Sequence, residues 1–554
     1  MKKIIECVPN FSEGRDSNVI NAIAKIIEAI SGVKLLGVDP GYAANRTVFT
    51  FAGEPEAVKI AAMRAIEKAT ELIDMTKHKG EHPRLGACDV VPFVPISGVT
   101  MDDCVKIAHE VGKWVAEELG VPVYMYEEAA TKPERKSLPN IRKGEYEGLP
   151  EKLKDPEWHP DYGEPRFNPK SGAYVIGARE FLIAYNVNLN TKDKKLANNI
   201  AKRIRENGYG LKNEKGEKVQ IPGLLSHVRA IGWYIDEYQI AQISINLLNY
   251  KKTPLWKVFE TCEEEARKDG LRVTGSEIVG LVTKEAILDA GKHFLKKQGK
   301  NTGIPESEII HIAVKSLGLN DVQKFEPEKK IIDFLIENPE ESKLQNMTIR
   351  SFVNELSTDS PAPGGGSVSA LCGALSAALT SMVANLTFGK KGYESVIEDM
   401  EIISTEAQEL KDSLLRIIDE DTRAFNGVMS AISLPKNTPE EINIRDEAIE
   451  AANKEATLVP MRVMELSMNL VKLASEIAEK GNKNALSDAG CALIQAVSAC
   501  QGAYYNVIMN LPGIKDETFK IQVINKAEEI LNNVVSSSRS KLEEIEHTLK
   551  NKLD

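Results

Sequence analysis

FLIAYNVNLN, residues 181–190, alternates apolar and polar side chains along its second half. Alternation with a period of two is typical of a β-strand that buries one face. QIAQISINLLN, residues 239–249, alternates in the same style further along the chain. The two stretches predict a compact α/β unit. Its other expected elements are strands at 224–234 and 276–282 and helices at 197–207, 254–269 and 284–297.

The 180 residues before this unit show the same mixture of elements. Amphipathic stretches at 17–29 and 55–73 separate short apolar runs. The predicted strands are 3–8, 33–38, 46–52, 89–94 and 121–126. Strands interleaved with helices indicate an α/β or α+β sandwich. We therefore expect two related lobes, at residues 1–180 and 181–325, rather than one large sheet.

The composition changes after residue 325. Residues 326–345 are charged and contain two prolines, which is typical of a linker. From residue 346 to residue 554, almost every segment has the apolar periodicity of a helix. We expect an all-α helical bundle there, with helices at 366–387, 394–432, 438–480, 485–510 and 516–550. Two fold classes in one chain suggest two separate functions.

The bulk composition is that of a soluble globular protein of 554 residues. Its formal charge of −11 argues against a general nucleic-acid binder. The seven cysteines are scattered without a CxxC pair, so neither a disulfide framework nor a zinc cluster is expected. No signal-peptide pattern is found, and no run approaches the ~18 apolar residues of a membrane helix. We expect a cytoplasmic protein without nucleic-acid or membrane partners.

Two of the eight histidines lie four residues apart in HKGEHPRLGACDVVPF, residues 78–93. The following proline biases His82 toward an extended conformation at the entrance of the predicted strand. A histidine beside Arg84 there suits general acid–base chemistry, whereas residue type alone favours a structural or surface role. His78 and His82 also have the spacing of a metal pair on a helix, but the nearby glycine and proline argue against such a helix.

SPAPGGGS, residues 360–367, precedes a long helix rich in Ala, Ser and Gly. Bare N–H groups at a helix start suit an anion, and small residues also permit close helix packing. No GK[ST] follows the glycines, so the stretch is not a P-loop. We expect close packing together with room for a flat ligand here.

LLRIIDEDTRAFNGVM, residues 414–429, places Asp421 in the middle of an apolar helical stripe. A carboxylate there is unfavourable unless it is paired, and its pKa tends upward, which suits proton transfer. A buried aspartate that caps a neighbouring helix is the alternative. Asp419 has Arg416 and Arg423 three and four residues away, so we expect it to face solvent in exposed ion pairs.

KGNKNALSDA, residues 480–489, is a polar turn between two predicted helices. Gly481 ends the first helix, and Ser487 and Asp488 lie in the first turn of the second. A plain helix–turn–helix explains most of this pattern. A polar cluster that faces the bundle interior is the functional alternative.

With these motifs the chain resembles the formiminotransferase-cyclodeaminases, the bifunctional folate enzymes of histidine degradation. In the first half the resemblance rests on ECVPNFSEGR (6–15), DPGYAANRTVFTFAG (39–53), EHPRLGACDVVPFVPI (81–96), GAREFLIAYNVNL (177–189), QISINLLNY (242–250) and GSEIVGLV (275–282). In the second half it rests on APGGGSVSAL (362–371), DEDTRAF (419–425), LPKNTPEE (434–441), GNKNALSDA (481–489) and GAYYNV (502–507). It covers nearly the whole chain, and both halves of the family are present.

The resemblance implies two reactions. The first moves a formimino group from N-formimino-L-glutamate to N5 of tetrahydrofolate. The second closes the product to 5,10-methenyltetrahydrofolate and releases ammonia. Polyglutamated tetrahydrofolate is the implied co-substrate, with no metal and no redox cofactor. The implied assembly is a homo-oligomer, an octamer built from dimers.

The resemblance also implies roles for individual residues. The catalytic histidine falls on His82 and the cyclodeaminase aspartate on Asp421. Arg46 and Arg84 are expected carboxylate partners, because arginine binds carboxylates in a bidentate manner. The folate-binding loop falls on Gly163, Glu164, Pro165, Arg166, Phe167, Asn168, Pro169, Lys170, Ser171 and Gly172. The other expected substrate-binding residues are Asp39, Gly364, Gly365, Gly366, Ser487 and Asp488.

The loop is less apolar than the resemblance leads us to expect. Arg166 and Lys170 either contact the glutamate tail of folate or are solvated. Two other functions stay open from the sequence: a folate-binding scaffold without activity, and a glutamate formyltransferase that acts on 5-formyltetrahydrofolate. His82 and Asp421 are both present, which argues against lost activity.

Overall fold

The computed structural model describes residues 3–42, 44–80, 82–212, 217–336 and 343–551. Contacts divide the chain into two compact units. The first comprises Met1–Asp289 and Leu317–Ile336, and the second comprises Ala290–Ser316 and Glu337–Asp554. Residues 290–316, which we expected in the second lobe, therefore group with the helical unit.

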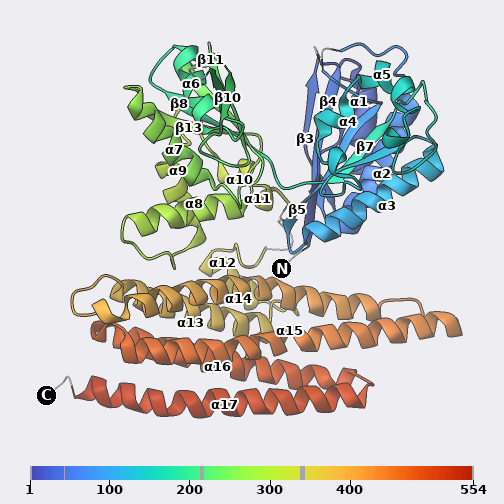
Figure 1. The fold of residues 1–554 in the computed structure, drawn as a ribbon. Coiled ribbons are helices and arrows are strands. Elements are labelled where there is room, and N and C mark those ends of the chain that lie inside the picture. Colours follow the sequence, from blue (N-terminus) through green and yellow to red (C-terminus); the bar gives the residue numbers. More distant parts are fainter. Residues whose placement is uncertain (1–2, 43, 81, 213–216, 337–342, 552–554) are drawn as a thin grey trace. The chain divides into compact units, whose positions relative to one another are not determined.

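A mixed seven-stranded sheet forms the first lobe (Figure 1). The strand order is β1-β4-β2-β5-β7-β6, and β3 pairs with β4. The strands are β1 Ile4–Cys7, β2 Asn10–Phe11, β3 Val33–Gly41, β4 Arg46–Gly53, β5 Cys88–Ser97, β6 Val123–Glu127 and β7 Tyr174–Ala178. We did not predict β7, which pairs in parallel with both β5 and β6 and so completes the sheet.

Helices cover both faces of this sheet. The core of one face is built by α1 (Ser17–Glu28), α2 (Pro55–Leu72) and α3 (Met101–Leu119). On the other face, residues of α4 (Leu138–Arg142) and α5 (Glu145–Lys152) form a smaller cluster with side chains from β5, β6 and β7. The result is the predicted α/β sandwich, with its strand ends available to hold polar side chains.

The second lobe is a four-stranded antiparallel sheet in the order β11-β12-β8-β13. The two stretches with alternating side chains are neighbours in it, because Asn186 of β8 pairs with Ser244 of β12. Its strands are β8 Ile183–Leu189, β11 Val228–Ile235, β12 Ile240–Leu247 and β13 Val273–Val279, and β9 Tyr209–Lys212 pairs separately with β10 Lys218–Ile221. The helices that follow β8 are α6 Lys194–Ile204, α7 Leu255–Lys268, α8 Lys284–Lys297, α9 Glu306–Ser316, α10 Pro327–Lys330 and α11 Ile332–Ile336.

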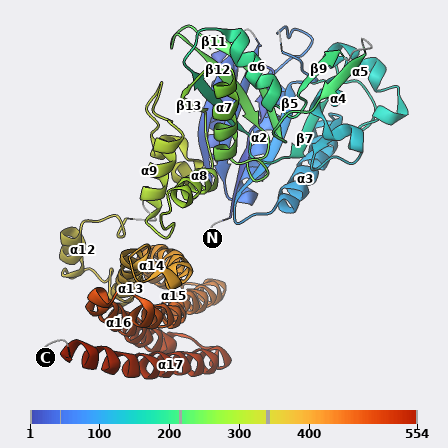
Figure 2. The same cartoon turned by 60° about the vertical axis from the view of Figure 1, so that its left-hand side comes forward.

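Long helices build the second unit, as predicted (Figure 2). They are α12 Ile349–Leu356, α13 Gly365–Thr387, α14 Ile397–Ile432, α15 Pro439–Lys480, α16 Leu486–Asn510 and α17 Glu517–Lys550. α13 is long and apolar enough to cross a membrane by length and composition alone. However, 61% of its most apolar window is buried inside the structure, so it serves as the core helix of the bundle.

Candidate active sites

The segment that carries His82 lies directly against the end of the predicted folate-binding loop. Ala87 N donates to Ser171 O at 2.9 Å, and Ala173 N donates to Leu85 O at 3.2 Å. No side chain fits at position 86, where the two backbones meet, because a Cβ on Gly86 would collide with the backbone of residues 171 and 173. Two motifs about 80 residues apart are thus joined at the entrance of β5.

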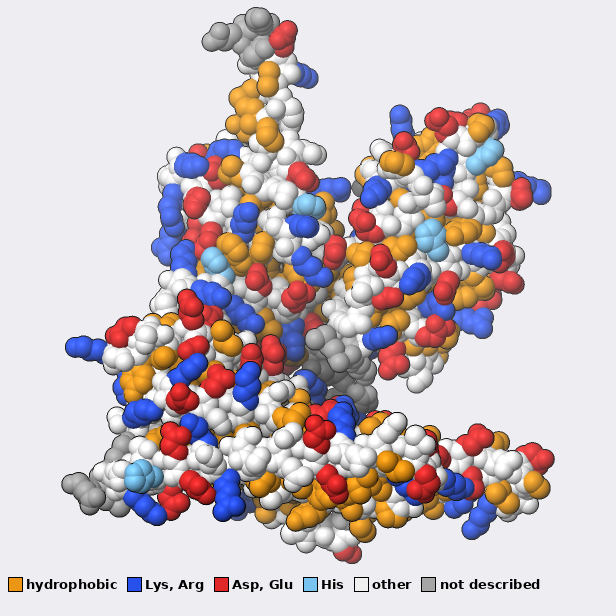
Figure 3. All heavy atoms as spheres, turned by 60° about the horizontal axis from the view of Figure 1, so that its bottom comes forward, with side chains coloured by type: hydrophobic (Ala, Val, Ile, Leu, Met, Phe, Trp, Pro, Cys, Tyr) orange, Lys and Arg blue, Asp and Glu red, His pale blue; other side chains and the backbone are white. Residues whose placement is uncertain are grey.

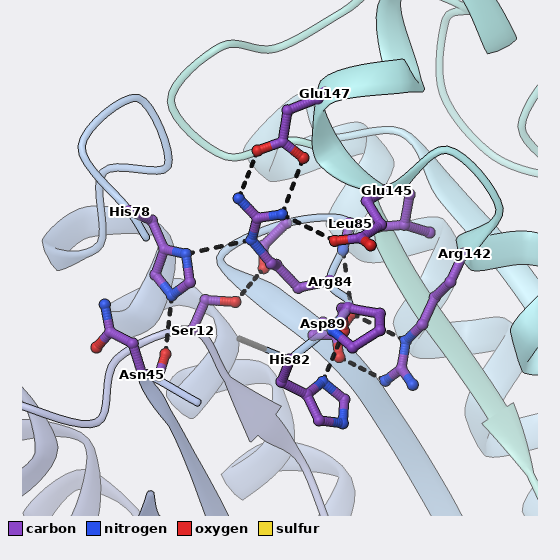
Figure 4. Close-up of polar contacts among 12 residues, drawn as sticks. Ser12, Asn45, His78, His82, Arg84, Leu85, Asp89, Arg142, Glu145 and Glu147 are labelled. Carbon is purple, nitrogen blue, oxygen red and sulfur yellow. Dashed lines mark hydrogen bonds and ion pairs between the residues drawn. The ribbon is translucent and has the colours of Figure 1, made fainter. Parts of the chain in front are cut away.

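The surroundings of His82 define which ring nitrogen is the base. Nδ1 lies 2.7 Å from the carbonyl oxygen of Pro83, which can only accept, and 3.2 Å from Nη1 of Arg46, which can only donate; the shorter contact favours the tautomer with the hydrogen on Nδ1 (Figure 4). Nε2 then has its lone pair, and the Nη1 atom of Arg46 lies 2.8 Å from it. Burial lowers the pKa of His82, and the charge of Arg46 lowers it further. Both effects favour the neutral form of His82, which is the form that can accept a proton.

Two further residues position this segment, and the sequence analysis missed both. The buried carboxylate of Asp89 accepts a hydrogen bond from Leu85 N at 3.1 Å and pairs with the guanidinium of Arg142. Asp89 thereby holds the chain three residues after His82 in place. An aspartate at the first position of an apolar strand was the available signal, but its partner follows 53 residues later.

The two arginines expected to bind carboxylates differ in their surroundings. The buried guanidinium of Arg84 pairs with Glu145 at 3.1 Å and with Glu147 at 2.6 Å. In Figure 4 this side chain points toward these acids and away from His82. Arg46 makes no ion pair with any residue in the described part of the chain. Arg46 is thus placed to receive a carboxylate beside His82, and Arg84 is not.

His78 has a structural environment. Its Nε2 atom lies 2.8 Å from the carbonyl oxygen of Asn45, and its Nδ1 atom accepts from Arg84 Nε at 3.3 Å. Burial lowers its pKa. His78 and His82 do not share a helix, and their ring nitrogens have different partners. Asp39 lies exposed on β3 and pairs through its backbone with Val48.

The predicted folate-binding loop is anchored at several points. Phe167 packs against Tyr146 with ring centroids 5.5 Å apart, and the Tyr146 hydroxyl donates to Pro169 O. Lys170 Nζ donates to the carbonyl oxygen of Glu71 at 2.8 Å, so this ammonium group is already engaged. The side chain of Arg166 is exposed. The loop is therefore fixed at its C-terminal half and open around residues 163–166.

In the helical unit, Asp421 of α14 faces the first turn of α13. Its Oδ2 atom lies 3.0 Å from the hydroxyl of Ser367, and that hydroxyl also lies 3.0 Å from Ile418 O. A Cβ on Gly366 would overlap the Asp421 carboxyl and displace it, so the glycine lets this carboxyl lie against the helix backbone. Burial raises the pKa of Asp421, and hydrogen bonds from Ser367 partly oppose this. The Asp421 carboxyl therefore has a raised pKa and lies against the first turn of α13.

The prediction for Asp419 was wrong. Its side chain is only 4% exposed and accepts hydrogen bonds from Leu344 N at 2.7 Å and Gln345 N at 3.0 Å. It is not paired with Arg416, which donates to Ser413 Oγ instead. The helical periodicity showed two arginines nearby, but it could not show that residues 344–345 pack onto this turn.

Ser487 and Asp488 lie far from Asp421 within one chain. The turn that precedes them packs against the C-terminal end of α13, because Asn482 N donates to Thr387 Oγ1 at 2.8 Å. α13 has 23 residues, which at about 1.5 Å per residue separates its two ends by about 33 Å. The structure therefore brings Gly366 to Asp421, with Gly364 and Gly365 just before it at the start of α13, and leaves Ser487 and Asp488 at the other end of that helix. Ser367, which the sequence analysis passed over, directly follows these glycines.

These observations are those expected of an enzyme with two candidate acid–base groups, His82 in the α/β unit and the buried carboxyl group of Asp421 in the helical bundle. Family models match the chain in three parts. They are the N-terminal subdomain of the formiminotransferase domain at residues 4–179, the formiminotransferase domain at 184–337, and formiminotransferase-cyclodeaminase at 348–529.

Individual relatives agree with these matches. The chain is 44% identical over 533 residues to the formimidoyltransferase-cyclodeaminase of Rattus norvegicus, which covers 96% of both chains. It is 43% identical to the glutamate formimidoyltransferase of Streptococcus pyogenes over 53% of this chain and 94% of the relative. It is 40% identical to the methenyltetrahydrofolate cyclohydrolase of Methylorubrum extorquens over 34% of this chain and 89% of the relative. The chain belongs to the formimidoyltransferase-cyclodeaminase family.

Proposed function

We propose that the chain is a bifunctional folate enzyme. Its first unit transfers the formimino group of N-formimino-L-glutamate to N5 of tetrahydrofolate. Its helical unit then converts 5-formiminotetrahydrofolate to 5,10-methenyltetrahydrofolate and ammonia. The observation that carries this proposal is the neutral His82, with its Nε2 lone pair beside Arg46 and its chain segment against the loop at 163–172.

The transferase step is one exchange of C–N bonds at an amidine carbon. N5 of tetrahydrofolate forms a bond to this carbon and loses its proton to His82 Nε2. The bond from the carbon to the glutamate nitrogen breaks, and the same proton returns to that nitrogen. One imidazole can serve in both directions because its ordinary pKa is about 6.5. One C–N bond replaces another and one proton is relayed, with no change of oxidation state, so this chemistry requires no redox cofactor.

Arg46 connects substrate binding to the base in this proposal. Formiminoglutamate carries two carboxylates, and the half-buried guanidinium of Arg46 can form a bidentate pair with one of them. A carboxylate at Arg46 would neutralise the cation that lowers the pKa of His82. Substrate binding then makes Nε2 more basic at the moment when it must accept a proton.

The cyclodeaminase step uses the second centre. N10 bonds to the formimino carbon and loses a proton, and the exocyclic nitrogen gains one before it leaves as ammonia. We assign that proton transfer to Asp421, because burial raises the pKa of its carboxyl group. Ser367 can donate to Ile418 O while it accepts from a protonated Asp421, so the protonated state satisfies all three groups.

Substitution of one residue in each unit tests both assignments. We expect His82→Ala to lower glutamate release about 10²- to 10⁴-fold while ammonia release from supplied 5-formiminotetrahydrofolate continues. We expect Asp421→Asn to show the opposite pattern, with 5-formiminotetrahydrofolate accumulating. Each variant is the control for the other. Full transferase activity in His82→Ala would contradict the assignment, and a reaction with 5-formyltetrahydrofolate alone would favour the glutamate formyltransferase.

The assembly belongs to this proposal as well. Hydrophobic side chains gather along the helical bundle (Figure 3). On two helices the exposed members share one face each, since they recur at spacings of 4, 7 or 11 residues. They are Leu375, Met382 and Leu386 on α13 and Ile494, Tyr505 and Met509 on α16. Exposed apolar faces of this kind support a homo-oligomer, for which we propose an octamer built from dimers in the cytoplasm; sedimentation would test the oligomer.

A further inference from the structure

Asn506 of α16 lies against the same turn of α13 as Asp421. A Cβ on Gly365 would lie 3.1 Å from Asn506 Nδ2 and 3.4 Å from its Oδ1, while a Cβ on the next residue, Gly366, would meet the Asp421 carboxyl. Two side chains from different helices therefore reach consecutive glycines.

The hydrogen bonds of Asn506 leave one atom available. Its Nδ2 atom donates to Gly502 O at 2.8 Å, one turn earlier on the same helix, which sets the orientation of the amide. In the described residues, no donor reaches its Oδ1 atom, and the side chain is half-buried. Oδ1 is thus an acceptor at the edge of the Asp421 site.

The chemistry of the second step needs such an acceptor. The formimino group of the intermediate is an amidinium, and its exocyclic nitrogen carries two N–H donors. N10 must approach the carbon while this nitrogen turns toward the acid that protonates it. A carboxyl oxygen can contact one side of the nitrogen, which leaves the other N–H unsatisfied unless a second acceptor faces it.

We propose that Asn506 orients the substrate by accepting one N–H of the departing nitrogen at Oδ1, while Asp421 relays the proton. In this step the N10–C bond forms and the N10 proton passes through Asp421 to the exocyclic nitrogen. The C–N bond then breaks, and ammonia leaves. The inference rests on the proposed cyclodeaminase function and adds a second polar residue to it.

Two substitutions separate this role from a purely structural one. Asn506→Asp keeps an acceptor at Oδ1 but removes the Nδ2 donor to Gly502 O, whereas Asn506→Leu removes both. If Asn506 had only a structural role, both substitutions would lower kcat/KM, because both remove the hydrogen bond to Gly502 O. An orienting residue requires only the acceptor, so we expect Asn506→Asp to stay within about 10-fold of the parent chain and Asn506→Leu to lose about 10- to 100-fold in kcat/KM.

Asn510 offers a matched control, because it lies one turn further along α16 and donates to Ala456 O at 2.8 Å. The full chain and the variants would be given 5-formiminotetrahydrofolate, with methenyl absorbance, ammonia and thermal unfolding recorded. We expect Asn510→Leu to keep its activity. Equal losses in Asn506→Asp and Asn506→Leu would overturn the inference, as would equal activity in Asn506→Leu and Asn510→Leu.

Failure of the proposed function would look different, since the parent chain itself would then release no ammonia. If Asn506→Leu proved unfolded, the comparison of Asn506→Asp with the parent would still decide the question. An inactive but folded Asn506→Asp contradicts the orienting role, and an active one supports it.

Discussion

The carboxylate of Asp419 holds the backbone of residues 344–345 against α14 by two hydrogen bonds. We expect its removal to destabilise the helical unit. Asp419 is 4% exposed and accepts from two backbone donors, Leu344 N at 2.7 Å and Gln345 N at 3.0 Å. Leu344 itself belongs to the bundle core. Hydrogen bonds to a charged group contribute about 1.5–3 kcal/mol, and a buried donor left unsatisfied costs about 1–3 kcal/mol.

Asp419→Asn keeps one acceptor oxygen and presents an NH2 group to the other donor. We therefore expect a loss of about 2 kcal/mol in the stability of the helical unit, and more for Asp419→Ala. Glu420→Gln is the matched control, because this neighbouring residue forms an ion pair with Arg462 at the surface. Such pairs contribute about 0–1 kcal/mol.

Amide hydrogen exchange measures these two hydrogen bonds directly. The amides of Leu344 and Gln345 should be protected in the parent chain and should exchange faster in Asp419→Asn, but not in Glu420→Gln. A fragment of residues 343–554 should also be more stable than one of residues 346–554, which lacks both donors. Unchanged exchange at the two amides, or equal unfolding temperatures of Asp419→Asn and Glu420→Gln, would refute this reasoning.

Two more predictions concern the pH response of the transferase and the packing of the helical unit. The pKa of His82 is lowered, so the base stays neutral to lower pH, and the acidic limb of transferase kcat/KM should lie below the ordinary value of about 6.5. Arg46→Met removes a cation and should move this limb to higher pH; a limb that stays in place would contradict the contact. Gly303→Ala should lower the unfolding temperature of the helical unit, because a Cβ there would collide with Ser404. Gly427→Ala, where a Cβ meets nothing within 4 Å, is its control, and equal unfolding temperatures would contradict the packing.

Periodicity predicted the elements whose fold depends on local sequence. The long bundle helices begin and end within a few residues of the expected positions, and the strands with alternating side chains are neighbours in one sheet. The short strand β7 escaped notice, because a buried strand of five apolar residues has no alternation to reveal it. Its place between β5 and the edge strand β6 is decided by its pairing with both.

The roles of several polar residues depend on partners distant in sequence, which the sequence pattern does not show. Arg46 and Arg84 were equivalent candidates for binding a substrate carboxylate. The glutamates that pair with Arg84 lie about 60 residues later, on α5. A helical wheel likewise showed that Asp419 and Asp421 occupy different faces, but both faces are covered by other segments. Which polar group is structural and which is available for chemistry depends on those segments.

The two centres use one physical effect in opposite ways. Burial is the largest cause of both pKa shifts, and burial always disfavours the charged form. For His82 it lowers the pKa and leaves a neutral base, which suits a reaction that begins with removal of a proton from N5. For Asp421 it raises the pKa and favours a protonated acid, which suits a reaction that ends with a proton on the departing nitrogen. In the proposed mechanism, the same desolvation thus prepares a base in one unit and an acid in the other.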